Sequence, residues 1–200
     1  MAPDHTVGAF TNAGKDDHEA QLVRIGDHTP EEAVKIYGAE EGPVPEWLRF
    51  AGGASAGPGQ TVTSTMNLEP GKYAMLDNAA FMGPVNSELG ALATFEVTAG
   101  TPGELPASTA TITALDNEEG EPEHEYEVSG LKLGKNRLLF ENKGTEVHHV
   151  VMFPILPGKA LDDLELRKAG RYALVCFVTD RDGKGKPHFQ MGMLKEVEVK

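Results

Sequence analysis

The chain lacks features that define several large classes of protein. It has one cysteine and one tryptophan in 200 residues, and 18 basic residues against 31 acidic ones, for a formal net charge of -13. A single cysteine, Cys176, excludes an internal disulfide and a four-cysteine zinc site. The shortage of Lys and Arg argues against a nucleic-acid binder, because phosphate backbones require clustered positive charge. No apolar run approaches the roughly 20 residues of a membrane span, so we expect no transmembrane segment.

Targeting and catalytic motifs are also missing from the sequence. Residues 1–5 show no basic segment followed by an apolar one, so we expect no signal peptide, which leaves the compartment open. The sequence contains no recognisable nucleophile–base pair, P-loop or glycine-rich dinucleotide motif. We therefore expect a binding protein or electron carrier rather than an enzyme.

Turn residues are abundant, and short apolar or alternating runs lie between them. The chain has 23 Gly and 13 Pro, and residues 109–113 and 196–199 alternate between apolar and polar side chains. Period-2 alternation between frequent turns is typical of all-β sandwiches. The sequence therefore predicts an all-β fold.

One helix is expected within this β pattern. Thr29 can cap a helix with Pro30 at its first position and Glu32 closing a capping box, and Gly38 can end it. A second, weaker helix is predicted over residues 160–168. Trp47 and Phe50 are aromatic residues that should pin the segment after the first helix onto the sheet.

An internal repeat is the most informative feature of the sequence. Matching residues keep their order along the chain, although the offset between the two halves changes from 130 to 99 and then to 102. The matched positions are Phe10, Asn12, Gly14 and His18 with Phe140, Asn142, Gly144 and His148; Pro58, Gly59, Gly71, Tyr73 and Ala74 with Pro157, Gly158, Gly170, Tyr172 and Ala173; and Gly90, Glu96 and Val97 with Gly192, Glu198 and Val199.

The repeat predicts two related domains, residues 1–100 and 101–200, divided by the turn-rich residues 98–103. The fall in offset gives the first domain 31 extra residues, which include the predicted helix. About thirty residues of strand pattern precede Phe140 in the second domain, but only nine residues precede Phe10. The first domain is therefore expected to lack its opening strands, either because the chain is trimmed or because a partner chain supplies them in an oligomer.

The second domain holds four residues whose chemistry suits one metal. They are His148, Cys176, His188 and Met193. A thiolate, two imidazoles and a weak thioether form the donor set of a blue-copper electron-transfer site. Strand alternation over residues 172–176 puts Cys176 on the face of its apolar neighbours, and of the adjacent His148 and His149 only one can point inward.

Three segments of the second domain, residues 142–151, 170–176 and 187–193, resemble the cupredoxin family, which includes plastocyanin, amicyanin and copper nitrite reductase. The last segment is similar to the family's Pro-His-x-x-x-Gly-Met ending. The eleven residues between Cys176 and His188 form a longer loop than in plastocyanin-like members, and nitrite-reductase-like members also have a longer loop.

The resemblance implies two cupredoxin-like Greek-key β-sandwiches, the first with a helical insertion. It implies one copper ion in the second domain, held by His148, Cys176, His188 and Met193. Met191 is an alternative to Met193, but the Gly-Met order favours Met193. One-electron transfer through this type 1 site, with His188 near solvent as the electron route, would be the function. It further implies an extracytoplasmic protein, secreted, periplasmic or at the cell surface, whose acidic charge steers a basic redox partner.

The first domain is expected to be a degenerate copy without copper ligands. His18 takes the place of His148, but Asp77, Asn86 and Ala91 stand where the cysteine, the second histidine and the methionine are expected. The remaining histidines, His5, His28, His124 and His149, are assigned no role. Two alternatives stay open: a metal-free binding or structural module, and copper delivery or storage with Met191 and Met193 as soft donors.

Overall fold

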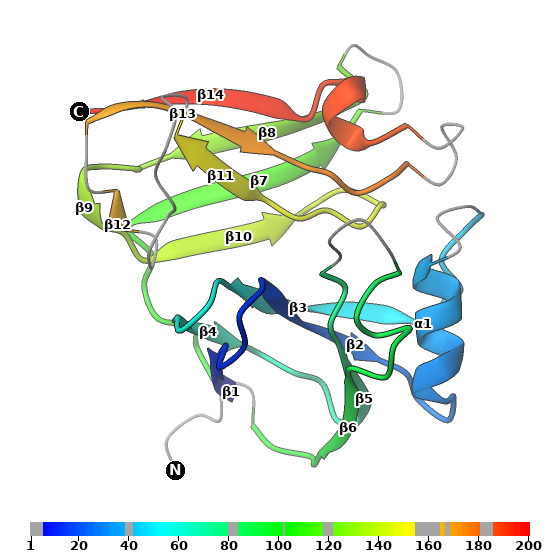
Figure 1. The fold of residues 1–200 in the computed structure, drawn as a ribbon. Coiled ribbons are helices and arrows are strands. Elements are labelled where there is room, and N and C mark those ends of the chain that lie inside the picture. Colours follow the sequence, from blue (N-terminus) through cyan, green and yellow to red (C-terminus); the bar gives the residue numbers. More distant parts are fainter. Residues whose placement is uncertain are drawn as a thin grey trace. The chain divides into compact units, whose positions relative to one another are not determined.

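The computed structural model describes residues 6–38, 42–79, 84–101, 103–117, 122–154, 165–166, 169–180 and 186–200. These residues are mainly short strands, most of them in antiparallel sheets (Figure 1), as the sequence predicts. The chain divides into two compact units, Met1–Pro106 and Ala107–Lys200, which we call unit 1 and unit 2. In the part of the chain that is described, no helix is long and apolar enough to cross a membrane.

Unit 1 contains a four-stranded antiparallel sheet, ordered β3-β2-β5-β6, and a two-stranded antiparallel sheet of β1 and β4. Its core consists of buried aliphatic side chains of the larger sheet together with residues of one helix, α1. The elements are β1 (Thr6–Thr11), β2 (His18–Arg24), α1 (Pro30–Gly38), β3 (Arg49–Ala56), β4 (Thr61–Met66), β5 (Gly71–Leu76) and β6 (Leu92–Val97).

The helix predicted after Thr29 is confirmed, together with its capping box. The Thr29 N–H donates to Glu32 Oε2 at 2.8 Å, and the Glu32 N–H donates to Thr29 Oγ1 at 3.2 Å. These reciprocal bonds satisfy two of the backbone donors that a helix start leaves without partners. Trp47 and Phe50 pack against the core that α1 completes, and Trp47 stacks on His28 at 3.9 Å.

Unit 2 contains two three-stranded sheets and one short strand pair. In the first sheet, ordered β10-β7-β8, β10 is parallel to β7, while the second sheet, β11-β13-β14, is antiparallel. The elements are β7 (Ala110–Asp116), β8 (His124–Ser129), β9 (Gly134–Lys135), β10 (Leu138–Asn142), β11 (Val151–Pro154), β12 (Glu165–Leu166), β13 (Gly170–Val175), the 3-10 helix η1 (His188–Met191) and β14 (Leu194–Val199).

Strand β13 has the expected inward face, although Val175 is buried as well. Tyr172, Leu174 and Cys176 are buried and belong to one hydrophobic cluster with residues of β7, β8 and β14. The second predicted helix is wrong where it can be examined, because Glu165–Leu166 form strand β12, paired with β9. Its other residues, 160–164 and 167–168, lie outside the described part. Two residues with extended backbone are enough to exclude a helix that runs through them.

The turns that follow β1 and β10 have the same hydrogen bonds. The N–H of Gly14 donates to Asn12 Oδ1 at 2.8 Å, and the N–H of Gly144 donates to Asn142 Oδ1 at 2.9 Å. In both turns the asparagine amide also donates to the carbonyl four residues further along the chain. These are residues that the sequence repeat pairs at an offset of 130.

The last two strands of each unit also share their register. Gly71 is opposite Val97 in the β5–β6 pair, and Gly170 is opposite Val199 in the β13–β14 pair. The residues matched by sequence therefore occupy the same places in the two ladders, although the intervening loops differ in length.

Strand β1 has a different partner from its sequence counterpart β10. β10 is parallel to β7, whereas β1 pairs antiparallel with β4. Among the described residues, unit 1 has no strand before β1 that could take the place of β7. The expected lack of opening strands and a partner chain that supplies them both stay predictions.

Candidate metal centre

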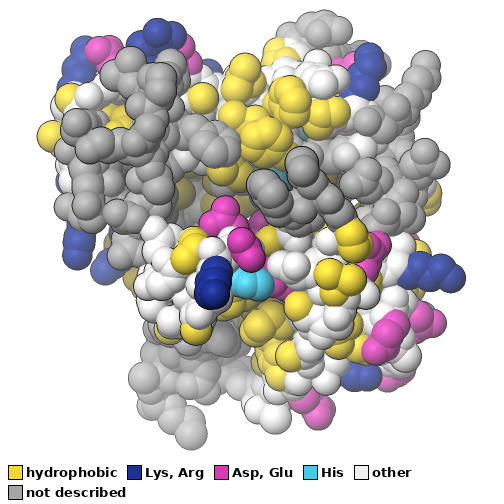
Figure 2. All heavy atoms as spheres, viewed as in Figure 1, with side chains coloured by type: hydrophobic (Ala, Val, Ile, Leu, Met, Phe, Trp, Pro, Cys, Tyr) yellow, Lys and Arg dark blue, Asp and Glu magenta, His cyan; other side chains and the backbone are white. Residues whose placement is uncertain are grey.

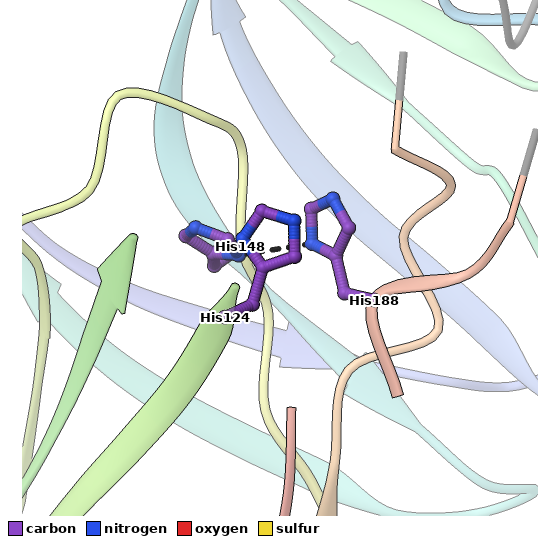
Figure 3. Close-up of side chains that lie close together, drawn as sticks. All are labelled: His124, His148 and His188. Carbon is purple, nitrogen blue, oxygen red and sulfur yellow. Dashed lines mark hydrogen bonds between the residues drawn. The ribbon is translucent and has the colours of Figure 1, made fainter. Parts of the chain in front are cut away.

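Three buried histidines of unit 2 come together from three different elements (Figure 3). His124 is the first residue of β8, His148 lies between β10 and β11, and His188 begins η1. Their exposed fractions are 6%, 7% and 0%. One ring nitrogen from each lies within 4.8 Å of the other two. The sequence separates these residues widely, so sheet pairing and loop paths bring them together.

The thiol of Cys176 lies beside two of these rings. Its Sγ is 3.6 Å from His188 Nδ1, and His188 Nδ1 is 3.0 Å from His148 Nδ1. Cys176 follows the last residue of β13 and is fully buried. Three of the four predicted metal ligands thus have their donor atoms close together.

Met193, the fourth predicted ligand, is fully buried in the same hydrophobic cluster as Cys176. Its backbone N–H donates to the His188 carbonyl at 2.9 Å, and its carbonyl accepts from the Cys176 N–H at 3.3 Å. Gly192, just before it, has a φ of 109°, a conformation that favours glycine. The tight turn after η1 is thereby fixed next to both His188 and Cys176.

The outer nitrogens of the two imidazoles beside Cys176 face carboxylates. His148 Nε2 is 2.7 Å from Asp116 Oδ1, and His188 Nε2 is 3.5 Å from Glu146 Oε2. A carboxylate on one ring nitrogen fixes the proton there and leaves the other nitrogen as the electron-pair donor. Asp116 thereby leaves Nδ1 of His148 as its electron-pair donor, whereas His188 Nε2 has no hydrogen-bond partner among the described residues and faces Glu146 at ion-pair distance only.

Asp116 is held by the loop after β10 as well as by histidines. Its Oδ2 accepts from the backbone N–H groups of Thr145 and Glu146 at 2.7 and 3.0 Å. Burial alone would raise the pKa of Asp116, but these bonds and the histidines outweigh it and hold the pKa far below 3.8. A Cβ on Gly144 would lie 2.3 Å from Oδ2, so only glycine fits against this carboxylate without a shift.

The same neighbours shift the pKa values of Cys176 and His188 in opposite directions. Burial raises the pKa of the Cys176 thiol, but hydrogen bonds from His148, His188 and the His149 backbone outweigh it and lower the pKa to about 5. Burial lowers the pKa of His188, yet Cys176 and Glu146 outweigh this and raise it to about 9. Between about pH 5 and about pH 9 these pKa values favour a Cys176 thiolate beside a protonated His188. In the metal-free protein a proton thus occupies the place where a cation could bind.

The structure corrects two points about individual histidines. His188 is fully buried, so the expectation that it lies near solvent is wrong. His124 received no role from the sequence, yet it lies in the cluster. Alternation along β8 was the available signal, because His124 and Tyr126 are buried while Glu125 and Glu127 are not. The two adjacent histidines do separate, since His149 Nε2 accepts from the Phe177 N–H outside the cluster.

Unit 1 has a polar cluster at the matching positions. Asp77 Oδ2 is 2.5 Å from His18 Nδ1 and accepts from Asn86 Nδ2 at 3.1 Å. Hydrogen bonds to Asp77 outweigh the effect of its burial and lower its pKa. His18 and Asp77 also line a surface pocket of about 390 Å³. In unit 1 the Asp77 carboxylate is a hydrogen-bond partner of the His18 imidazole. The matching positions carry no thiolate, second imidazole or thioether.

The backbone around this cluster is the same as around the candidate metal centre. The N–H of Asp77 donates to the Ala91 carbonyl at 3.2 Å, as the N–H of Cys176 does to Met193 at 3.3 Å. The N–H of Ala91 donates to the Asn86 carbonyl at 2.9 Å, the bond that Met193 makes to His188. The two units therefore share a local frame and differ in the side chains that the frame carries.

Comparison of the chain with models of protein families, with curated proteins and with solved structures finds no match.

Proposed function

We propose that unit 2 binds one copper ion through His148, Cys176, His188 and Met193, and that the protein carries single electrons. In this proposal both units are cupredoxin-like Greek-key β-sandwiches, and unit 1 has lost its ligands. The shared turns, ladder registers and backbone frame support a common fold for the two units.

The convergence of one sulfur and two Nδ1 atoms in a buried space carries the proposal. Donors bound to one ion at about 2.0 Å for nitrogen and about 2.3 Å for sulfur lie roughly 3 to 4 Å from one another. The separations of 3.0 Å between the two Nδ1 atoms and 3.6 Å between sulfur and His188 Nδ1 fall in this range. A thiolate with two imidazoles suits copper in both of its common oxidation states.

The surroundings of these donors suit electron transfer. Asp116 accepts a hydrogen bond from His148 Nε2, Glu146 faces His188 Nε2 at 3.5 Å, and η1 is fixed to Cys176 by the bond from the Phe189 N–H to the Cys176 carbonyl at 3.0 Å. A bound copper ion would supply the one-electron chemistry. The chain's part is to hold its donors in place and exclude water, since Cys176, His188 and Met193 are fully buried.

Charge supports a basic partner for such a carrier. The chain has a net charge of -13, and acidic side chains lie at several places on the face drawn in Figure 2. Long-range attraction by net charge speeds the encounter of redox proteins and weakens as salt is added.

Copper titration of the purified protein tests the proposal. Cu(II) should produce an intense visible thiolate-to-copper band that saturates at one ion per chain. The band should be absent in Cys176→Ser and in His148→Gln. His18→Gln changes the histidine at the matching position of unit 1 and should leave the band unchanged.

Two results would overturn the proposal. One is a colourless protein that takes up copper weakly and independently of Cys176, which would favour a metal-free binding or structural module. The other is a band that His148→Gln leaves intact. Circular dichroism of each variant separates loss of the ligand from loss of the fold.

A further inference from the structure

A buried nitrogen of His124 is not used by the proposed copper site. His124 is 6% exposed, and its Nδ1 is 2.7 Å from Asp116 Oδ1. With the proton on Nδ1, Nε2 is the nitrogen that carries the electron pair. This Nε2 is buried and has no hydrogen-bond partner among the described residues. A buried polar atom without a hydrogen-bond partner destabilises the folded state, so the position of His124 Nε2 indicates that a ligand binds there.

The orphaned nitrogen lies among rings that can share a ligand with it. The His124 ring centroid is 4.2 Å from that of His188 and 5.5 Å from that of His148. Figure 3 shows the three rings gathered at one place, with the His124 ring in front of the hydrogen bond that joins His148 and His188. One nitrogen of each ring lies within 4.8 Å of the other two, near the roughly 3 to 4 Å that separates the ligands of a single ion.

One carboxylate orients two of these three rings. Asp116 Oδ1 is 2.7 Å from His124 Nδ1 and 2.7 Å from His148 Nε2. A carboxylate behind a histidine fixes its tautomer and raises its basicity as a metal ligand. Glu146 faces the third ring, His188, at 3.5 Å. The two carboxylates also supply negative charge that would balance a divalent cation.

We infer that His124, His148 and His188 form a second, overlapping binding position for a nitrogen-preferring divalent cation of the Zn²⁺ class. It shares two imidazoles with the proposed copper position and replaces the sulfur of Cys176 by His124 Nε2. The two positions cannot be filled together, because His148 and His188 serve both. Three imidazoles are an established donor set for Zn²⁺ and for related ions such as Co²⁺. The inference does not depend on copper binding or on electron transfer.

Zn²⁺ titration in competition with a chromophoric chelator tests this assignment. His124→Gln should lower the Zn²⁺ affinity at least about tenfold. Removal of a residue that only hydrogen-bonds to a metal ligand already costs about that much, and His124 is a direct ligand in this assignment. Cys176→Ser should keep Zn²⁺ binding while it loses the copper band, and His124→Gln should keep the copper band. His28→Gln, a histidine of unit 1 outside the cluster, serves as the control and should leave both unchanged.

Co²⁺ binding to the wild-type protein gives a readout that needs no variant to fold. Coordination by three imidazoles predicts visible d–d bands without a strong sulfur-to-cobalt charge-transfer band. The inference is overturned if the wild-type protein binds no Zn²⁺, if His124→Gln binds it as tightly as the wild type, or if Co²⁺ shows the full sulfur band. Failure of the copper proposal would instead appear as a missing Cys176-dependent copper band.

Discussion

Asp116 hydrogen-bonds to two of the three clustered histidines of the candidate metal centre. A largely buried carboxylate is stable only when hydrogen bonds replace the water that it loses. Asp116 receives them from His124 at the start of β8 and from Thr145, Glu146 and His148 in the loop after β10. Because one side chain orients two histidines, the proton positions on both rings are set before any ion arrives.

Cys176 provides a prediction at the residue scale. In the metal-free protein its thiolate should appear with a midpoint near pH 5, because hydrogen bonds from His148, His188 and the His149 backbone lower its pKa to about 5. The ultraviolet absorbance of the thiolate, followed against pH with Cys176→Ser as the blank, measures this. A thiolate that appears only near pH 9 would contradict the hydrogen-bonded geometry.

The same shift has a direction for stability. The pKa of Cys176 is lower in the folded protein than the value of 9.0 expected for an unfolded chain. The thiolate therefore stabilises the folded state most above pH 9, and this contribution is lost as the pH falls through about 5. Cys176→Ser should remove this part of the pH dependence in urea unfolding. A variant whose pH dependence equals that of the wild type would exclude the contribution.

At the scale of elements, the turn between η1 and β14 sets the positions of His188 and Met193. Gly192 and its sequence counterpart Gly90 both have a positive φ, 109° and 98°. A Cβ at Gly192 would lie 2.1 Å from the Cβ of Pro122, whereas a Cβ at Gly90 meets nothing within 4 Å. Alanine substitutions at these two glycines therefore separate the cost of a strained backbone, which both share, from the cost of a steric clash, which only Gly192 has.

Gly90→Ala should therefore destabilise unit 1 by only about 1 to 2 kcal/mol, the cost of a left-handed backbone for an L-residue. Gly192→Ala should destabilise unit 2 by roughly 2 to 4 kcal/mol, because overpacking adds to the strain. Thermal unfolding, with hydrogen exchange in β6 and β14 to assign the loss to a unit, measures both. Equal losses would mean that Pro122 does not press on this turn.

The elements also show where sequence patterns succeed. The capping box at Thr29 predicts α1 correctly because its bonds join residues three positions apart. The helix expected over residues 160–168 is wrong at Glu165–Leu166, since pairing with β9 outweighs local helix preference there. Local patterns predict an element when the stabilising contacts are themselves local.

At the scale of the whole molecule, one backbone frame occurs twice and carries two different sets of side chains. The hydrogen bonds around Asp77 and Asn86 repeat those around Cys176 and His188. The difference in chemistry between the units therefore lies in the side chains and in the strands that surround them. Among its described residues unit 1 has no counterpart of β7 and none of Asp116.

Restoring the missing donors in unit 1 tests this view. The triple variant Asp77→Cys, Asn86→His, Ala91→Met should raise the copper stoichiometry from one ion per chain to two, as measured by native mass spectrometry. The second ion should bind at least about tenfold more weakly, because no carboxylate like Asp116 orients His18. A folded triple variant that still binds one ion would show that the frame alone does not position the donors.

The sequence by itself determined the β character, the position of α1, the correspondence of residues between the two halves, and the inward side of the strand that ends at Cys176. All of these follow from periodicities and spacings within a few residues or from direct comparison of the two halves. Tertiary structure alone decided that Asp116 meets His148 and that His124 joins His188. These contacts cross 32 and 64 positions of the chain, and only strand pairing and the paths of the loops fix distances over such separations.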